Sequence, residues 1–396
     1  MSKYILIISA VYPPEPVVSA RLSSDLYHNL KDKELSVKVI HPCPTRPNGF
    51  VFDTKVQQGS DEIVTESFTC PQSSLWGRFR ESFSFGKECA NHIREHHQEI
   101  ACIYANAWPL GSQYWIVKAA KKYGIPVAMH VQDVYPESLT NKLPSFISRL
   151  VKTLLLPMDK YILRNSDRVI VISEKMKAHL VGTRGIEARK VSVVINWQDE
   201  TEFLNYQKTA LPESYDKFTF MYMGNIGPVA GVDLLIDAFE AAQLNGVRLV
   251  IAGSGSMKES LKEKAKNNKN IEFWDVPNGK VPEIQSKADV MMLPIKKGAA
   301  SSSIPSKLPA YMFSAKPIIG SMDVESDTAN AIIDSEGGII VEPENKDALA
   351  LVMEGMATKD NTELEKMGQY GQMYALKHFS KGSNLSNLSK VIQELI

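Results

Sequence analysis

The sequence predicts an α/β protein of two doubly wound domains, each built on a parallel sheet covered by helices. Short apolar runs alternate with helix-length amphipathic segments along nearly the whole chain, which is the pattern of parallel β-sheets. The chain has 396 residues, too many for one ordinary hydrophobic core. The runs fall into two sets of about six, and each set is enough for one doubly wound sheet.

The apolar runs are the expected strands. In the first half they are YILIISA (4–10), VKVIHP (37–42), IACIYANA (100–107), PVAMHVQD (126–133), RVIVIS (168–173) and VSVVIN (191–196). In the second half they are FTFMYMG (218–224), VRLVIAG (247–253), IEFW (271–274), VMMLP (290–294), PIIGS (317–321) and GIIVEP (338–343).

The domain boundaries follow from a polar stretch between the two sets of strands. Residues 196–217 lack an apolar run and are the expected linker. We therefore expect an N-terminal Rossmann-like domain over 1–198 and a C-terminal one over 199–375. The final segment, 376–396, is expected to be a helix that crosses back to the first domain.

Composition narrows the class of protein. Hydrophobic residues make up 44% of the chain, charged residues 23%, and the formal net charge is zero, which argues against disorder and against a dedicated nucleic-acid binder. Residues 118–190 nevertheless contain 14 Lys and Arg against 6 Asp and Glu. This local excess indicates either an anionic surface or ligand near the first domain, or a solvated positive face.

Compartment signals point to the cytoplasm. The four cysteines have neither disulfide-framework nor zinc-finger spacing, so we expect reduced thiols; they are Cys43, Cys70, Cys89 and Cys102. The N-terminal apolar run ends at Pro13 and Pro14 and predicts a strand and a turn rather than a signal peptide. No run approaches the roughly 20 apolar residues of a membrane span, so any membrane contact is expected to be peripheral.

The turns after the strands are the places to look for ligands, because open α/β sheets bind ligands beyond the carboxyl ends of their strands. In the second domain these turns are MGNIGPVAG, with Gly224 and Gly227, and AGSGS, with Gly253 and Ser254. Glycines there either let backbone amides approach an anion or form tight turns.

Lys307 is the unusual residue of the second half. In SSSIPSKLPAYMF it stands in the first turn of a predicted helix, where the helix dipole disfavours a cation. A phosphate group bound at this helix start would make the choice favourable, because amides and an ammonium together form an anion site. The residues expected around that anion are Ser303, Ile304, Pro305, Ser306 and Lys307.

The turn VQDVYPES places carboxylates beyond a strand of the first domain. Gln132, Asp133 and Glu137 could orient sugar hydroxyls, and Asp133 could serve as a base, but Asp133 could equally cap a turn. His130 lies within the strand and is expected in the core. A histidine trio, His92, His96 and His97, is expected on a solvated helix face. No Asp-x-Asp pair is present, so we expect no metal and no cofactor.

Two segments resemble surface-binding helices. WGRFRESFSFGK (76–87) interleaves Trp76, Phe79, Phe83 and Phe85 with arginines and a lysine, and PSFISRLVKTLLLPMDKYILR (144–164) has an apolar stripe beside basic residues. Basic amphipathic helices of this kind either lie in the headgroup plane of a membrane or pack on a core.

Several motifs resemble those of the bacterial retaining glycosyltransferases of family 4, most closely the members that assemble O-antigen, capsule and colanic acid. The motifs span nearly the whole chain: YPPEPVVSARL (12–22), HVQDVYPESL (130–139), SDRVIVISEKMKAHL (166–180), INW (195–197), MGNIGPVAGVDLLIDAF (223–239), PSKLPAYMFSAKPII (305–319) and GSMDVESDTANAII (320–333).

The resemblance implies the GT-B fold, with two Rossmann-like domains facing across a cleft, and metal-independent sugar transfer with retention. The donor would be a UDP- or GDP-sugar and the acceptor a polyprenyl-diphosphate-linked saccharide, met at the inner leaflet of the cytoplasmic membrane. It implies catalytic roles for Lys307 and Asp133. Donor contacts would come from Gly224, Asn225, Gly227, Gly253, Ser254, Ser303, Ile304, Pro305, Ser306, Lys307 and Asp327. Acceptor contacts would come from Glu15, Arg21, Gln132, Asp133 and Glu137.

The sequence departs from the family at four places. Asn225 and Ala230 stand where many members have the arginine and lysine that hold the diphosphate, and Ser302 and Ala310 stand where they have two glutamates. Lys307 would then supply the missing positive charge. The alternatives are an inactive relative, a nucleotide-sugar 2-epimerase of the same fold, and a non-catalytic binder of nucleotide sugars or glycans.

Overall fold

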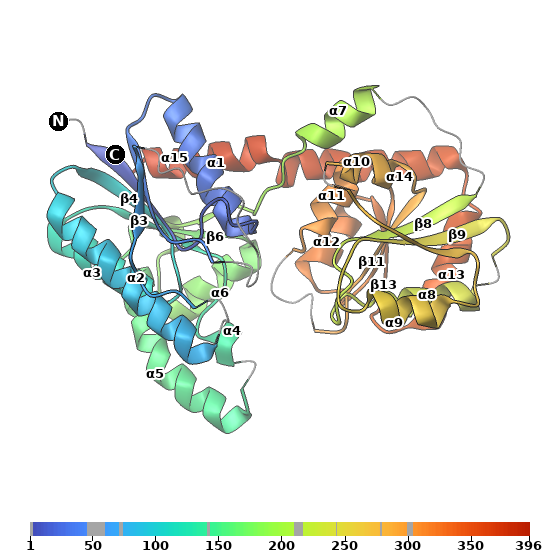
Figure 1. Cartoon of the computed structure of the whole chain (residues 1–396), viewed down its shortest axis with the longest axis horizontal. Helices are drawn as coiled ribbons and strands as arrows, with labels where there is room; N and C mark the ends of the chain where they lie inside the picture. Colours follow the sequence, from blue (N-terminus) through green and yellow to red (C-terminus); the bar gives the residue numbers. More distant parts are fainter. Residues whose placement is uncertain are drawn as a thin grey trace. The chain divides into compact units, whose positions relative to one another are not determined.

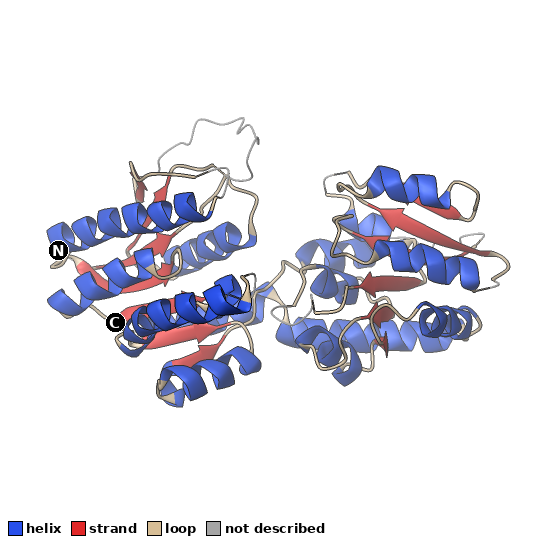
Figure 2. Ribbon diagram, turned by 90° about the horizontal axis from the view of Figure 1, so that it is seen from below, coloured by secondary structure: helices blue, strands red, loops and turns tan. Residues whose placement is uncertain are grey.

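The computed structural model describes residues 3–45, 60–70, 74–140, 143–209, 217–242, 244–277, 279–298 and 304–396. The chain forms two compact units, one of Met1–Asn196 with Asn384–Ile396 and one of Trp197–Ser383 (Figure 1). The first boundary lies two residues before the one that the sequence suggests, and the second lies eight residues after it. Each unit is a parallel sheet with helices on both faces, as Figure 2 shows. The prediction of two doubly wound α/β domains is confirmed.

The first unit has a seven-stranded sheet in the order β3-β2-β1-β4-β5-β6-β7. Its elements are β1 (Tyr4–Ser9), α1 (Val18–Asp32), β2 (Val37–Pro42), β3 (Glu62–Thr65), α2 (Leu75–His96), β4 (Ile100–Asn106), α3 (Gly111–Tyr123), β5 (Val127–Val131), α4 (Glu137–Thr140), α5 (Ser145–Arg164), β6 (Arg168–Val171), α6 (Glu174–Arg184), the 3₁₀ turn Ala188–Lys190 and β7 (Val191–Val193). Of these strands, only β3 was not predicted.

The second unit has a six-stranded sheet in the order β10-β9-β8-β11-β12-β13. Its elements are α7 (Thr201–Thr209), β8 (Phe218–Met223), α8 (Val232–Ala241), β9 (Val247–Ala252), α9 (Lys258–Ala265), β10 (Ile271–Trp274), α10 (Val281–Ser286), β11 (Val290–Pro294), α11 (Lys307–Phe313), β12 (Ile318–Ser321), α12 (Asp327–Asp334), β13 (Gly338–Val341), α13 (Lys346–Ala357) and α14 (Asn361–His378). α15 (Lys381–Gln393) follows and belongs to the first unit from Asn384 onward. All six strands were predicted, but the expected linker contains α7.

Side-chain caps fix where several helices begin. Ser173 accepts a hydrogen bond from the amide of Met176 at the start of α6, and Ser326 does the same for Ala329 at the start of α12. Such caps satisfy amides that the first turn of a helix leaves without partners. Gly185 ends α6 in the left-handed conformation, at φ 65°. Local sequence thus sets the helix ends that position the loops beyond the strands.

Helix packing gives each unit its own core. In the first unit, Phe85 and Cys89 of α2, Val117 of α3 and Ile162 of α5 are fully buried on one face of the sheet. The right-handed crossover from β1 to β2 places α1 on the opposite face, where the ammonium of Lys33 donates to Ser389 of α15. The burial of Phe85 favours core packing, one of the two alternatives for segment 76–87, at that position.

Candidate functional site

The carboxyl ends of β8 and β11 form the point in the second unit where the strand order reverses. β8 connects to β9 on one side of the sheet, whereas β11 pairs with β8 on the other. Ligands of open α/β sheets bind at this position. The predicted donor residues Gly224, Asn225 and Gly227 follow β8 directly, and Gly253 and Ser254 follow β9.

The two glycine loops pack backbone against backbone. The amide of Gly224 donates to the carbonyl of Ala252 at 3.0 Å, and the amide of Ile226 donates to the carbonyl of Ser254 at 2.8 Å. Gly253 has φ 126°, and a Cβ added to it would lie 2.2 Å from the carbonyl oxygen of Gly224. Only glycine fits there without moving backbone. The structure therefore brings the two predicted loops together.

Lys307 is the first residue of α11 and its side chain lies across the loop after β8. A Cβ added to Gly224 would lie 2.2 Å from the Lys307 Cε, so the missing side chain at 224 leaves room for the lysine. The ammonium lies 5.3 Å from the centroid of the Tyr222 ring. Burial lowers the pKa of Lys307. Within the described residues this ammonium has no acidic partner, which leaves its charge available to an anion.

Two tyrosines hold α11 and the loop in register with β8. The fully buried Tyr311 hydroxyl donates to the carbonyl of Met223 at 2.7 Å and accepts from the amide of the same residue at 2.8 Å. The Tyr222 hydroxyl donates to the carbonyl of Asn225 at 2.6 Å. These bonds satisfy the backbone groups at the end of the strand, so Lys307 is held against a fixed loop.

The other predicted donor residues are less closely connected. Ile304, Pro305 and Ser306 lead into α11, while Asp327 begins α12, beyond a strand that is separated from β8 by β11. Ser303, which was predicted to bind the donor, and Ser302 lie outside the described residues.

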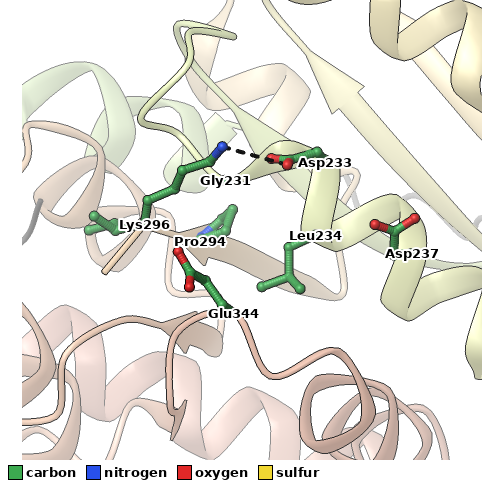
Figure 3. A pocket seen from close by; sticks show the side chains of 8 residues that line it. Gly231, Asp233, Leu234, Asp237, Pro294, Lys296 and Glu344 are labelled. Carbon is green, nitrogen blue, oxygen red and sulfur yellow. Dashed lines mark ion pairs between the residues drawn. The ribbon is translucent and has the colours of Figure 1, made fainter. Parts of the chain in front are cut away.

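A pocket of about 200 Å³ lies beside this region, at the end of β11 and the start of α8 (Figure 3). It is lined by Gly231, Asp233, Leu234, Asp237, Pro294, Ile295, Lys296 and Glu344. Its one cation, Lys296, lies 3.6 Å from the carboxylate of Asp233. Three carboxylates against one paired ammonium disfavour a diphosphate there. None of the predicted donor residues lines this pocket.

The first unit has a polar pocket of about 110 Å³ where β1, β4 and β5 end, which we call the β1–β4–β5 pocket. Its lining is Ala10, Val11, Ser19, Asn106, Ala107, Trp108, Pro109, Gln113, His130, Gln132 and Asp133. β1 and β4 are neighbours at the point where this sheet also reverses its strand order. The pocket thus brings together two predicted acceptor residues, Gln132 and Asp133.

A hydrogen-bonded relay runs behind this pocket. The Tyr104 hydroxyl lies 2.6 Å from Nδ1 of His130, and Nε2 of His130 lies 2.9 Å from the amide nitrogen of Gln132. The side-chain carbonyl of Gln132 in turn accepts a hydrogen bond from the side-chain amide of Asn196 at 2.8 Å. Burial lowers the pKa of His130 to about 3, so its ring is neutral near pH 7 and its Nε2 accepts a hydrogen bond from the side-chain amide of Gln132. The relay fixes Gln132 at both ends.

His130 and Asp133 differ in exposure although both line the β1–β4–β5 pocket. His130 is buried, as predicted for a core residue, yet one edge faces the pocket. Asp133 is exposed, and among the described residues its carboxylate has no hydrogen bond or ion pair. A free carboxylate at this position can accept bonds from sugar hydroxyls or take a proton.

Glu15 and Arg21 lie in a second hollow of the first unit, of about 370 Å³, at the start of α1. It is lined by Pro13, Glu15, Pro16, Val17, Val18, Arg21, Ser24 and Asp25. The buried carboxylate of Glu15 accepts from the amide of Thr45 at 2.8 Å. The five predicted acceptor residues therefore do not share one pocket.

Glu137 lies in neither hollow, because its carboxylate is bound in an ion network. Arg184, which is 1% exposed, donates to both oxygens of Glu137 at 2.5 and 3.0 Å and to Asp159 at 2.6 Å. Lys152 lies 3.2 Å from Glu137 as well. Burial alone would raise the pKa of Glu137, but the bonds from Arg184 and Lys152 lower it to about 2. Burial raises the pKa of Asp159 to about 6 against the effect of Arg184.

The histidine trio differs from the expected solvated face. His92 is partly buried and lies 3.2 Å from the Tyr4 hydroxyl, and burial lowers its pKa to about 4. His96 lies 3.2 Å from the carboxylate of Glu99. Among the residues that the structure describes, no three or more side chains of His, Cys, Asp or Glu are grouped as metal ligands.

Comparison with known families assigns the chain. The family described as "Glycosyl transferase 4-like domain" matches residues 19–197, and the family described as "Glycosyl transferases group 1" matches residues 217–358. Both matches coincide with the two Rossmann-like units and their glycine and Lys307 region. The chain is a glycosyltransferase of the GT-B type.

The relatives are bacterial. The probable glycosyltransferase WbjE of Pseudomonas aeruginosa is 22% identical over 285 residues, which cover 69% of each chain. The "Putative colanic acid biosynthesis glycosyl transferase WcaI" of Escherichia coli (strain K12) is 25% identical over 201 residues, 48% of this chain and 49% of WcaI. This glycosyltransferase is thus related to bacterial polysaccharide enzymes.

A solved structure shares the fold over the full length. Anabaena HepE in complex with UDP superposes with a TM-score of 0.64 at 14% identity, covering 99% of this chain and 100% of HepE. At that identity the likeness supports the GT-B fold alone, which agrees with the two parallel sheets described above.

Proposed function

We propose that this glycosyltransferase moves a sugar, with retention and without a metal ion, from a UDP- or GDP-sugar to a polyprenyl-diphosphate-linked saccharide. The product would enter a cell-surface polysaccharide such as O-antigen or capsule. A lipid-linked acceptor would place the enzyme in the cytoplasm, at the inner leaflet of the membrane. The binding of UDP by HepE and the relationship to WcaI support the donor class and the pathway class.

The observation that carries the proposal is the half-buried ammonium of Lys307 over the glycine loop that follows β8. Gly224 and Gly253 have no side chains, so the backbones of the two loops stay accessible. Among the described residues, no carboxylate pairs with the ammonium of Lys307. A nucleoside diphosphate bound there would receive the positive charge that Asn225 and Ala230 do not provide. As the bond from sugar to diphosphate breaks, the charge that develops on the leaving phosphate would be stabilised by Lys307 and the amides at the start of α11.

The β1–β4–β5 pocket is the proposed acceptor site. Gln132 is fixed by His130 and Asn196, so it can orient one acceptor hydroxyl, and the free carboxylate of Asp133 can bind another or accept its proton. Glu15 and Arg21 would contact a further part of the acceptor from the hollow at α1. For Glu137 we propose an indirect role through its ion network with Arg184.

The test is nucleotide release from UDP- and GDP-sugars with and without a lipid-diphosphate acceptor. Release that requires the acceptor supports transfer. Isomerised donor without acceptor would instead show an epimerase, and neither product would show a binding protein. Unchanged turnover in a chelator supports metal independence, and the anomeric configuration of the product, read by NMR, tests retention.

The Lys307→Met variant tests the proposed role of the Lys307 ammonium. Removing the ammonium should lower turnover by roughly 100-fold, as loss of one strong electrostatic contact to a transition state does. The control is Lys262→Met, which removes an exposed lysine of α9 paired with the exposed Glu259. If Lys307→Met turns over as fast as the control, the ammonium does not stabilise the leaving group.

A further inference from the structure

The two halves of α5 have different surroundings. Near its C-terminus, Asp159, Ile162 and Leu163 are buried in the first unit. The first thirteen residues, 145–157, contain no buried side chain although seven of them are Phe, Ile, Val or Leu. Figure 1 shows this N-terminal end of α5 projecting beyond α4. Leu155 packs partly buried against the core, whereas the side of the half-helix that carries Phe146 and Leu150 presents an apolar surface to solvent.

The exposed side chains form one stripe. Phe146 is 81% exposed, Ile147 46%, Leu150 56% and Leu154 68%, and their spacing puts them on one side of the helix. Elsewhere in the described chain, the large exposed hydrophobic residues of the second unit, such as Ile333, Leu351 and Met373, come from separate helices. A contiguous exposed stripe, unlike single exposed residues, indicates a binding surface.

The first turn of α2 carries a second exposed apolar group. Trp76 is 84% exposed and Phe79 47%, and their rings lie 6.4 Å apart. α2 and α5 both pack against α3 in the first unit, and both begin on the side of the sheet where the strands end. Tryptophan favours the boundary between lipid and water.

The charges beside the apolar stripe of α5 indicate which kind of partner would bind it. Residues 143–158 contain no aspartate or glutamate, but they contain the exposed Arg149 and the partly exposed Lys152, whose ammonium also lies 3.2 Å from Glu137 of α4. A cationic apolar helix face complements anionic lipid headgroups, with the apolar side chains in the acyl boundary and the cations among the phosphates. Among the described residues no helix is long and apolar enough to cross a membrane, so this contact would lie in the headgroup plane.

We propose that the N-terminal half of α5, with the first turn of α2, docks this chain on an anionic phospholipid bilayer. The inference deepens the proposed function and rests on it for the role of the membrane. α4 and α5 follow Gln132 and Asp133 directly in the chain, so docking would hold the β1–β4–β5 pocket near the surface that carries a lipid-linked acceptor.

The test is co-sedimentation of the full chain with phosphatidylglycerol-rich vesicles, and with pure phosphatidylcholine vesicles, in the absence of donor and acceptor. The wild type should bind the anionic vesicles, and binding should weaken in high salt. The triple variant Phe146→Ser/Leu150→Ser/Leu154→Ser should bind at least about tenfold more weakly, since it loses three insertable side chains. Arg149→Glu should weaken binding to anionic vesicles only.

The matched control is Ile333→Ser/Leu351→Ser/Met373→Ser, which removes three exposed hydrophobic residues of the second unit and should bind like the wild type. Both triple variants change exposed sites, so unaltered thermal unfolding will show that they fold. Equal vesicle binding by the two triple variants overturns the proposal. A wild-type dimer that the α5 variant converts to a monomer, without vesicle binding, would also overturn it by showing a second copy as the occupant. Because no sugar is present, failed transfer and failed docking remain distinguishable.

Discussion

Replacing Arg184 by methionine tests how the loop beside the β1–β4–β5 pocket is held. Its guanidinium donates to Glu137, Asp159 and the carbonyl of Tyr135, and it is 1% exposed. It therefore ties α6 to α5 and to the turn that follows Gln132. Methionine keeps most of the apolar stem but removes every one of these bonds.

The expected loss of folding stability in Arg184→Met is large, because the carboxylates of Glu137 and Asp159 would remain without their main partner. Asp159 is buried and Glu137 is mostly buried, so neither can recover full hydration. Breaking a buried ion pair from one side costs about 3–5 kcal/mol. For a unit of this size that corresponds to a fall in the melting temperature of roughly 10 °C. Most of that cost should disappear in the triple variant that also carries Glu137→Gln and Asp159→Asn.

The pH dependence gives a second readout. Burial already holds the pKa of Asp159 at about 6 in the folded protein, above its usual value, and loss of Arg184 should raise it further. A carboxyl whose folded pKa is raised loses its contribution to stability as the pH rises through that value. The deficit of Arg184→Met should thus be greatest at pH 8 and smaller at pH 5.

Thermal unfolding followed by circular dichroism measures both effects. The control is Arg189→Met, because Arg189 is 82% exposed and its partner Glu187 is 56% exposed, a pair expected to contribute less than about 1 kcal/mol. If Arg184→Met melts within a degree or two of Arg189→Met at pH 8, the network does not hold this part of the fold, and the reasoning from burial is wrong.

Three further predictions concern single contacts. Gly253→Ala should lower the melting temperature and weaken nucleotide binding more than Gly246→Ala, because both have positive φ but only the methyl group at 253 meets backbone, at 2.2 Å. Tyr311→Phe should cost about 1–3 kcal/mol in chemical denaturation, since the amide and carbonyl of Met223 lose their buried partner; an unchanged midpoint would contradict this. His130→Gln should reduce the loss of stability on acidification. Because the folded pKa of His130 is lowered to about 3, the free energy of unfolding of the wild type should fall by about 1.4 kcal/mol per pH unit below pH 6.5. Parallel plots of stability against pH for the variant and the wild type would contradict the assignment.

The strands could be predicted because each is a short apolar run in a chain of alternating helices and strands. β3 was missed since it has four residues at the edge of its sheet and only Thr65 is buried, which leaves too weak a hydrophobic signal. α7 was missed because its segment buries only Phe203 and otherwise has the composition of a polar linker. Edge strands and connecting segments bury few side chains, so the periodicity of hydrophobic residues predicts them poorly.

The candidate sites were predictable in part. Their loops follow strands, and that rule located Gly224, Gly253 and Gln132. Partners distant in the chain were not predictable: nothing near Glu137 in the sequence indicates that Arg184, 47 residues away, occupies its carboxylate. His130 shows a different limit. It was assigned to the core from its place in a strand. A residue near the end of a strand can be buried and still face a pocket.

Lys307 occupies a position that the local rules of protein stability disfavour. The helix dipole disfavours a cation at that position, and burial disfavours its charge, while the Tyr222 ring offers about 0.5–2 kcal/mol in return. A methionine would pack in the same space without those costs. Two glycines at positive φ, where a side chain would clash, and Tyr311, which makes two hydrogen bonds to Met223, nevertheless maintain the arrangement. Costs of this kind gather where a protein keeps a site ready for a ligand, and at Lys307 the negative charge of the proposed phosphate ligand would offset them.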